Sequence, residues 1–152
     1  AGKYGLDEKD VVLDIALKAA EVLTNNYLGI EIKLSRTVDE TLSLDERTKM
    51  ANNWTADYFV SIHSNAYNGS ANGFESFIYN EDVSKETKDR QNDIHDYLSK
   101  KINRTDRGEK TANFHVLRES TMPAILLEFL FIDNPHENKL LKNKNYRENL
   151  GI

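Results

Sequence analysis

The sequence contains no cysteine, and this absence excludes several kinds of protein. Without thiols there is no disulfide scaffold, no thiol nucleophile and no thiolate-bound metal. Any metal would therefore need histidine and carboxylate ligands. The four histidines of the chain are His63, His95, His115 and His136.

Long apolar runs and flexible, low-complexity segments are also missing. No stretch approaches the roughly 18 apolar residues that a membrane helix requires, and charged residues make up 30% of the chain. We therefore expect no membrane partner. The net charge of −5 argues against nonspecific binding to DNA or RNA, so we expect no nucleic-acid partner. Two prolines and seven glycines in 152 residues leave no room for a flexible linker, so the length predicts one domain.

Hydrophobic periodicity predicts an α/β fold. Helices are predicted at 8–26, at 43–54 after a Ser43/Glu46 capping box, at 84–102 and from about residue 135. Strands are predicted at 30–34, 58–63, 74–79, 114–117 and 124–132, with 58–63 buried on both faces. This order predicts a single domain with a mixed central β-sheet and helices on both faces.

Glu128 interrupts the most apolar run of the chain, 124–132. An ionised carboxylate in such a run needs compensation for its lost hydration. One explanation is a structural salt bridge to an arginine such as Arg118. The other is a general acid/base whose pKa is raised by its surroundings.

The other candidate residues have weaker individual signals. His63 ends a predicted strand, where ligands collect in open α/β sheets, but a histidine there also fits a hydrogen-bonded rim position. Glu8 begins the first predicted helix, where the helix dipole alone favours an acid. His95, His115 and His136 are predicted to be surface or rim residues. Phosphate-loop, nucleophile-elbow and His-Glu-x-x-His motifs are missing from the sequence.

Several short motifs together resemble one enzyme family. In chain order they are Gly5-Leu-Asp-Glu-Lys-Asp10, Ser35-Arg-Thr37, Ser43-Leu-Asp-Glu-Arg47, Ala51-Asn52, Ala56-Asp57, Ser61-Ile-His-Ser-Asn-Ala66, Gly73-Phe-Glu-Ser76, Val116-Leu-Arg-Glu-Ser120 and Met122-Pro-Ala-Ile-Leu-Leu-Glu128. With this set, the chain resembles the zinc-dependent N-acetylmuramoyl-L-alanine amidases of the type-3 family, especially bacillus sporulation lysins and phage endolysins. The resemblance extends from Gly5 to about Leu141.

The resemblance implies one Zn²⁺ per chain and a role for each matching residue. Glu8 and His63 match two of the zinc ligands, and Glu128 matches the catalytic acid/base. Asn65 and Arg118 lie beside the motifs, as does the loop 67–72, and we expect them to line the substrate groove.

The family pattern has a third zinc ligand, a histidine in a loop after the first strand. We expect that strand and that histidine upstream of Ala1, so 1–152 would be an amidase catalytic domain incomplete at its N-terminus.

The implied reaction is zinc-dependent hydrolysis of the amide between the lactyl group of N-acetylmuramic acid and L-alanine in peptidoglycan. The expected enzyme is a monomer that is secreted to the cell wall or released on lysis. Two alternatives remain: a catalytically impaired peptidoglycan-binding domain of the same fold, and a glycosidase that uses Glu128 with a second carboxylate.

Overall fold

The computed structural model describes residues 2–152. Two compact units divide the chain. The first unit contains the chain up to Thr41, together with Ser64–Asn72 and Phe129–Ile152. The second unit contains Leu42–His63 and Gly73–Glu128. Within the described residues, the structure has no helix both long enough and apolar enough to cross a membrane.

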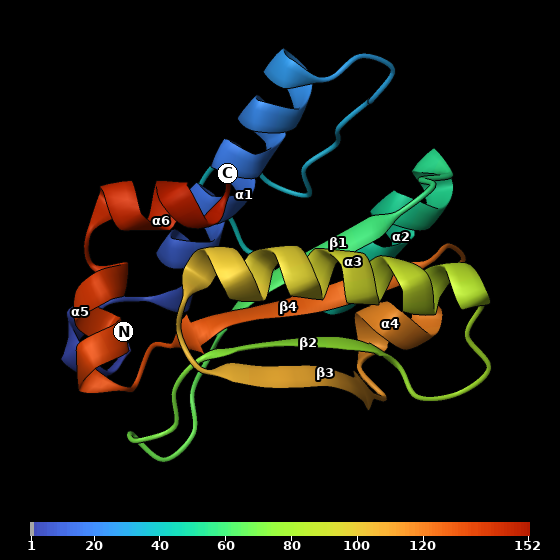
Figure 1. Ribbon diagram of the computed structural model, residues 1–152. Coiled ribbons are helices and arrows are strands. Elements are labelled where there is room, and N and C mark those ends of the chain that lie inside the picture. Colours follow the sequence, from blue (N-terminus) through green and yellow to red (C-terminus); the bar gives the residue numbers. More distant parts are fainter. Residues whose placement is uncertain (1) are drawn as a thin grey trace. The chain divides into compact units, whose positions relative to one another are not determined.

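A four-stranded sheet has the order β1-β4-β2-β3 (Figure 1). The strands are β1 (Phe59–Asn65), β2 (Phe74–Tyr79), β3 (Asp106–Ala112) and β4 (Ala124–Phe131). β2 and β3 are parallel and are joined through α3 (Lys85–Ile102), which makes a βαβ unit. The arrows of β4 and β3 point in opposite directions in Figure 1, so the sheet is mixed. The predicted α/β class is confirmed.

β1 and β4 are parallel neighbours. At their first residues, Phe59 N donates to Pro123 O at 3.0 Å, and at their far ends Ile132 N donates to Asn65 O at 2.8 Å. The carboxyl ends of both strands therefore lie at the same edge of the sheet.

Helices cover both faces of β2. Alternate side chains of a strand point to opposite faces. Ser76 faces α3, where its Oγ lies 2.8 Å from His95 Nδ1. Phe77 and Tyr79 pack instead against the buried cluster that contains Val116 and Leu117 of α4 (His115–Glu119). We call the side of the sheet that carries Phe77 and Tyr79 the α4 face.

The capping box at α2 (Leu44–Trp54) forms as the sequence predicts. Glu46 N donates to Ser43 Oγ at 3.1 Å, and Ser43 N donates to the Glu46 carboxylate at 2.7 Å. Two backbone N–H groups of the first helical turn, which have no partner within the helix, are thereby satisfied.

The first unit is mainly helical. It contains the short 3-10 helix η1 (Lys3–Gly5), α1 (Glu8–Asn26), α5 (Pro135–Leu141) and α6 (Lys144–Leu150). α6 packs against both α1 and α5, and Arg147 Nε bonds to Asp14 Oδ2 at 2.7 Å. Val11 and Ile15 are the buried residues of α1, as its amphipathic pattern predicts.

Three local predictions are wrong and one is incomplete. Residues 30–34 form no strand, and Ile30 and Ile32 are exposed. The predicted strand 114–117 is largely the helix α4, and the strand β3 replaces it earlier in the chain. The last helix begins at Pro135 as predicted, but it ends at Leu141 and a second helix, α6, follows. β1 is mostly half-buried rather than buried on both faces, and among residues 2–152 its one neighbouring strand is β4.

Candidate active site

His63 lies on the α4 face of the sheet. Phe59, four residues earlier on β1, packs against the α4 cluster, and residues two apart in a strand share a face. The side chain of Ser61 follows the same alternation, with Oγ 2.9 Å from His63 Nε2. His63 is half-buried, so its imidazole is held by the protein but reaches solvent.

Glu128 lies on the same face of the neighbouring strand. Ala124 and Leu126 belong to the α4 cluster, and Glu128 follows at the next alternate position. It is the one half-buried residue of β4, and the other seven residues of the strand are buried. His63 and Glu128 are each the fifth residue of parallel neighbouring strands. The sheet therefore brings these two predicted site residues to one surface.

Arg118 does not support the salt-bridge explanation for Glu128. Its Nε bonds to Glu119 Oε1 at 2.8 Å and its Nη1 bonds to Asn113 Oδ1 at 2.7 Å. It lies on α4, which packs near Phe77 and Tyr79 rather than at the end of the α4 face where Glu128 lies. A role for Arg118 in substrate binding stays a prediction.

Glu8 is the first residue of α1, and its side chain is exposed. One carboxylate oxygen, Oε1, accepts a hydrogen bond from the backbone N–H of Ser64 at 3.2 Å. Ser64 directly follows His63 in the chain. The helix start thus holds the Glu8 carboxylate against the backbone at the end of β1.

The donor types of Glu8 and His63 suit zinc, which binds carboxylate oxygen and imidazole nitrogen. A catalytic zinc site usually has three protein ligands and a water. Among residues 2–152, no group of three or more His, Asp or Glu side chains is placed to hold a metal ion. The two residues therefore fit zinc in chemistry but fall one ligand short in number. The histidine expected upstream of Ala1 lies outside the described residues.

Asn65 ends β1 and begins the loop that the sequence predicted to line the groove. Its Oδ1 accepts the backbone N–H of Ala66 at 3.0 Å. Asp133 fixes the next part of this loop, because its Oδ2 accepts the N–H groups of Tyr67 at 2.9 Å and Gly69 at 3.0 Å. The side chain of Tyr67 is 80% exposed. The loop is braced from its backbone and presents an aromatic side chain to solvent.

Glu75 is a feature of the α4 face that the sequence interpretation missed. It precedes Phe77 by two residues, and its side chain is 6% exposed. It accepts hydrogen bonds from Arg107 Nε at 3.0 Å and from Lys110 Nζ. Burial alone raises the pKa of Glu75, but the bonds and charges of Lys110 and Arg107 outweigh it and hold the pKa below its usual value. Glu75 is therefore a buried carboxylate kept ionised by two cations.

His95 is buried, contrary to the surface position predicted from its helix. Its Nδ1 lies 2.8 Å from Ser76 Oγ and its Nε2 lies 2.8 Å from Asp106 Oδ1. The hydrogen bonds from His95 and from the Gly108 N–H lower the pKa of Asp106. Ser76 is fully buried, so this Ser-His-Asp chain cannot meet a substrate and joins α3 to β2 and β3.

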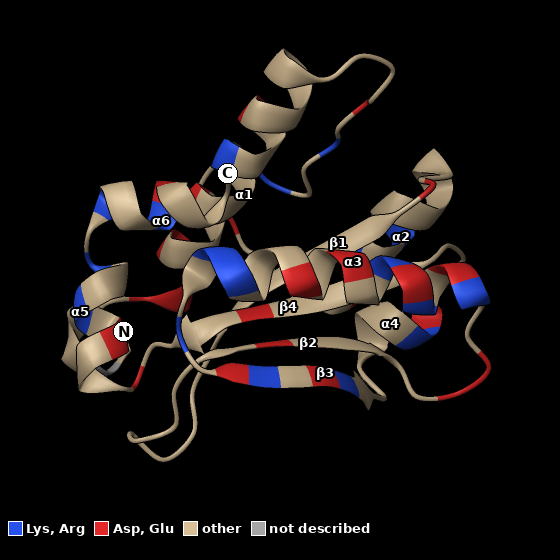
Figure 2. Cartoon of the chain, viewed as in Figure 1, with Lys and Arg blue, Asp and Glu red and all other residues tan. Residues whose placement is uncertain are grey.

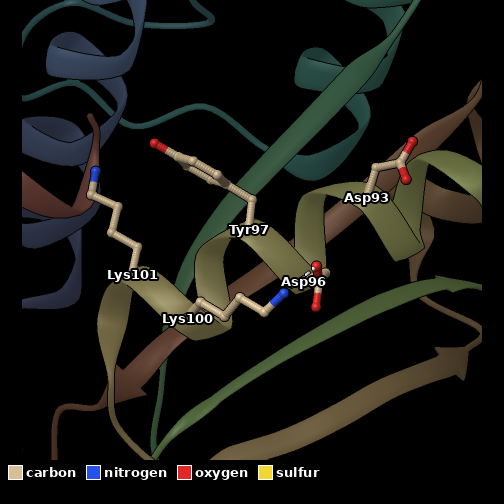
Figure 3. Close-up of a pocket in the computed structure, with 5 residues that line it drawn as sticks. All are labelled: Asp93, Asp96, Tyr97, Lys100 and Lys101. Atoms are coloured by element: carbon tan, nitrogen blue, oxygen red, sulfur yellow. Dashed lines mark hydrogen bonds and ion pairs between the residues drawn. The ribbon is translucent and has the colours of Figure 1, made fainter.

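A hollow of about 640 Å³ on α3 does not coincide with these residues. Its lining residues are Asp93, Asp96, Tyr97, Lys100 and Lys101. Figure 3 shows the five side chains diverging along one helix, with Lys100 directed toward Asp96, its ion-pair partner at 2.8 Å. Since α3 covers the face of β2 opposite to the α4 face, we do not consider this hollow the active site.

Comparisons with known proteins identify the family of the chain. The family model described as N-acetylmuramoyl-L-alanine amidase matches residues 1–152. The chain is 49% identical over 147 residues to a sporulation-specific N-acetylmuramoyl-L-alanine amidase of Bacillus subtilis (strain 168), covering 97% of this chain and 56% of the relative. It is 42% identical over 150 residues to an endolysin of Bacillus phage SPP1, covering 96% of this chain and 55% of the relative.

A solved structure gives the same result for the fold. The crystal structure of an N-acetylmuramoyl-L-alanine amidase from Clostridium difficile 630 superposes with a TM-score of 0.90 at 37% identity, covering 97% of this chain and 80% of that chain. The chain thus spans a little over half the length of the two curated relatives and most of the solved structure. The chain belongs to the N-acetylmuramoyl-L-alanine amidase family.

Proposed function

We propose that this chain hydrolyses the amide bond between the lactyl group of N-acetylmuramic acid and L-alanine in peptidoglycan, with a zinc ion as cofactor. The observation that carries the proposal is the placement of His63 and Glu128 on one face of parallel neighbouring strands. The family supports the substrate, since its members share the name of this reaction.

Glu8 and His63 are the residues that would hold the zinc. Their oxygen and nitrogen donors suit the ion, and a complete catalytic site would need one further protein ligand. When bound, zinc supplies Lewis acidity, which lowers the pKa of water and polarises the substrate carbonyl.

Glu128 is the proposed general acid/base. Its carboxylate takes a proton from the water that attacks the lactyl carbonyl carbon. As the carbon–nitrogen bond breaks, Glu128 delivers that proton to the alanine nitrogen, which leaves as an amine. Glu128 is half-buried, and its buried neighbours in β4 keep the strand in place.

The site of action that we propose is the bacterial cell wall, reached outside the cell or after lysis. The sporulation and endolysin relatives support both routes.

The test is the Glu128→Gln variant on purified cell walls. We expect the rate at which new L-alanine amino groups appear to fall by about 10²- to 10⁴-fold, with an unchanged circular dichroism spectrum. Glu86→Gln is the matched control, because this exposed glutamate on α3 undergoes the same chemical change away from the α4 face. Wild-type digestion by Glu128→Gln would contradict the proposal. Release of reducing sugar without new amino groups would support a glycosidase instead.

Zinc is tested separately, by metal analysis of the purified protein and by its removal. We expect close to one zinc per chain where the site is complete, and loss of amidase activity on treatment with a chelator. Full activity in the metal-free protein would contradict the zinc part of the proposal while leaving the amidase reaction intact.

A further inference from the structure

Glu75 and its two bonded cations, Arg107 and Lys110, form a cluster that we call the Glu75 cluster. This cluster lies beside Glu128 on the α4 face. β4 and β2 are neighbours and run in opposite directions, as the arrows in Figure 1 and the parallel β2-β3 pair together indicate. Ala124 and Leu126 share a cluster with Phe77 and Tyr79. Two residues further along β4 is Glu128, and two residues back along β2 is Glu75, so the alternation brings both to the same end of this face.

The cluster carries a surplus of positive charge. Two cations, Arg107 and Lys110, bond to the single carboxylate of Glu75. Their side chains are 31% and 37% exposed, whereas Glu75 is 6% exposed. The anion is thus inside and the cations are outside, at the surface. The low pKa of Glu75 keeps that carboxylate charged at neutral pH.

The chain geometry fixes which residues face this surface. β3 contains one extra residue opposite β2, in the segment where Gly108 has a φ of 89°. This bulge allows Arg107 and Lys110, three residues apart, to point to the same side. Asp106 and Glu109 point to the other side, where they bond to His95 and Asn92 of α3. Figure 2 shows these charges alternating along β3, whereas β4 is almost entirely uncharged.

Lys110 is held in place from a second direction. Its Nζ lies 5.9 Å from the centroid of the Phe77 ring, within reach of a cation–π interaction. Phe77 is in turn fixed by an edge-on contact with Phe114, at 5.2 Å between ring centroids. A cation fixed in this way loses little conformational freedom when it binds an anion.

We propose that Lys110 and Arg107, held by Glu75, bind the free α-carboxylate of the residue that follows L-alanine in the peptidoglycan stem peptide. Neighbouring strands are about 4.8 Å apart, so β3 is about 10 Å from β4. Two extended residues span about 7 Å, and the lysine and arginine side chains cover the remainder. A stem peptide that crosses from β4 over β2 to β3 therefore reaches the cations with its second residue. This subsite rests on the proposed amidase function.

The subsite predicts discrimination between two natural forms of the stem peptide. The second residue carries either the free carboxylate, as D-isoglutamate, or its amide, as D-isoglutamine. A charge-assisted bond to the carboxylate favours the first form by about tenfold or more. The experiment compares kcat/KM for N-acetylmuramoyl-L-alanyl-D-isoglutamate and its isoglutamine analogue, together with the Kd of L-alanyl-D-isoglutamate and of its amide.

Lys110→Gln is the main variant. It should lose about tenfold or more of both kcat/KM and affinity for the carboxylate form, chiefly through KM, and change less than about twofold for the amide form. Lys110→Arg keeps the charge and should restore the preference, which separates the role of the charge from a general effect on folding. Lys100→Gln removes the same charge from the surface of α3 and should retain the wild-type preference.

Two outcomes would overturn the subsite. One is an equal loss of kcat/KM for the carboxylate and amide substrates in Lys110→Gln. The other is a wild-type protein that prefers neither form in kcat/KM or in Kd. Hydrolysis without discrimination leaves the amidase function standing and rejects the subsite. Peptide binding that discriminates without any hydrolysis supports the subsite and rejects the proposed reaction. The two proposals therefore fail separately.

Discussion

The Oγ of Ser61 lies 2.9 Å from Nε2 of His63, two residues further along β1. A hydrogen bond at one ring nitrogen fixes the orientation and the tautomer of an imidazole. The strand places both side chains on the α4 face, so the contact is built into the extended backbone.

Replacement of Ser61 by alanine is expected to weaken zinc binding about 10- to 100-fold, because the imidazole loses this support. Competition with a chromophoric chelator measures the change. Ser99→Ala is the control, since its hydroxyl bonds to the carbonyl of Asp96 within α3, away from His63. Equal zinc affinity in the two variants would show that Ser61 does not orient His63.

The lowered pKa of Glu75 predicts how the stability of the fold changes in acid. Its pKa is lower in the folded protein than the ordinary value of 4.5, so the unfolded chain takes up a proton at higher pH than the folded one. The stabilisation is therefore fully present above about pH 4.5 and is lost as the pH falls through the lower folded value.

Glu75→Gln should accordingly lower the free energy of unfolding by about 1 to 3 kcal/mol at pH 7, because two cations lose their charged partner. The same variant should show a shallower decline of stability in acid. Urea denaturation from pH 3 to pH 7 measures both. Glu86→Gln breaks an exposed pair with Arg90 on α3 and should have little effect. Parallel curves for wild type and Glu75→Gln would contradict the assignment.

Strong periodicity explains which elements the sequence predicts correctly. α1, α2, β2 and β4 form within a residue or two of their predicted ranges. β4 is a nearly continuous apolar run, α1 has an amphipathic pattern, and α2 begins at its predicted capping box. β3 lacks this signal. Its sequence is mostly polar or charged, and its place comes from hydrogen bonds to β2 at the edge of the sheet. The segment 30–34 is the reverse case, because its sequence has the alternating pattern of a strand but the structure forms no strand there.

The candidate site was predictable as a set of residues but not as a geometry. Sequence motifs select His63 and Glu128, yet their position on neighbouring strands depends on the strand order, which no local pattern contains. Glu75 was missed because a single acid in a short strand resembles any surface acid. For His95 a signal existed, since Gln91, His95, Leu98 and Ile102 recur at helical spacing and are all buried.

Gly73 and Gly29 form a matched pair of left-handed glycines. Gly73 has a φ of 107°, and a Cβ added there would lie 2.1 Å from the carbonyl oxygen of Thr105. That oxygen accepts the N–H of Phe74 at 2.9 Å, so it cannot move without breaking the start of β2. Gly29 has a φ of 76° with nothing within 4 Å of the added Cβ.

Gly29→Ala should therefore cost about 1 to 2 kcal/mol, from the backbone conformation alone. Gly73→Ala should cost at least about 2 kcal/mol more, because it adds a collision with backbone. The midpoints of urea denaturation compare the two variants under the same conditions. Similar losses would mean that the turn before β2 can relax, and that the close approach of Thr105 does not constrain it.

The capping box of α2 gives a prediction that is independent of the active site. In Ser43→Ala, the N–H of Glu46 loses its acceptor, and we expect the free energy of unfolding to fall by about 1 kcal/mol. Ser43→Asn supplies another good cap and should retain most of the stability. Both changes leave Glu128 and His63 untouched, so the amidase rate measured at 25 °C should stay at the wild-type level. Equal stability of the alanine and asparagine variants would show that the Ser43 hydroxyl contributes nothing to the start of the helix.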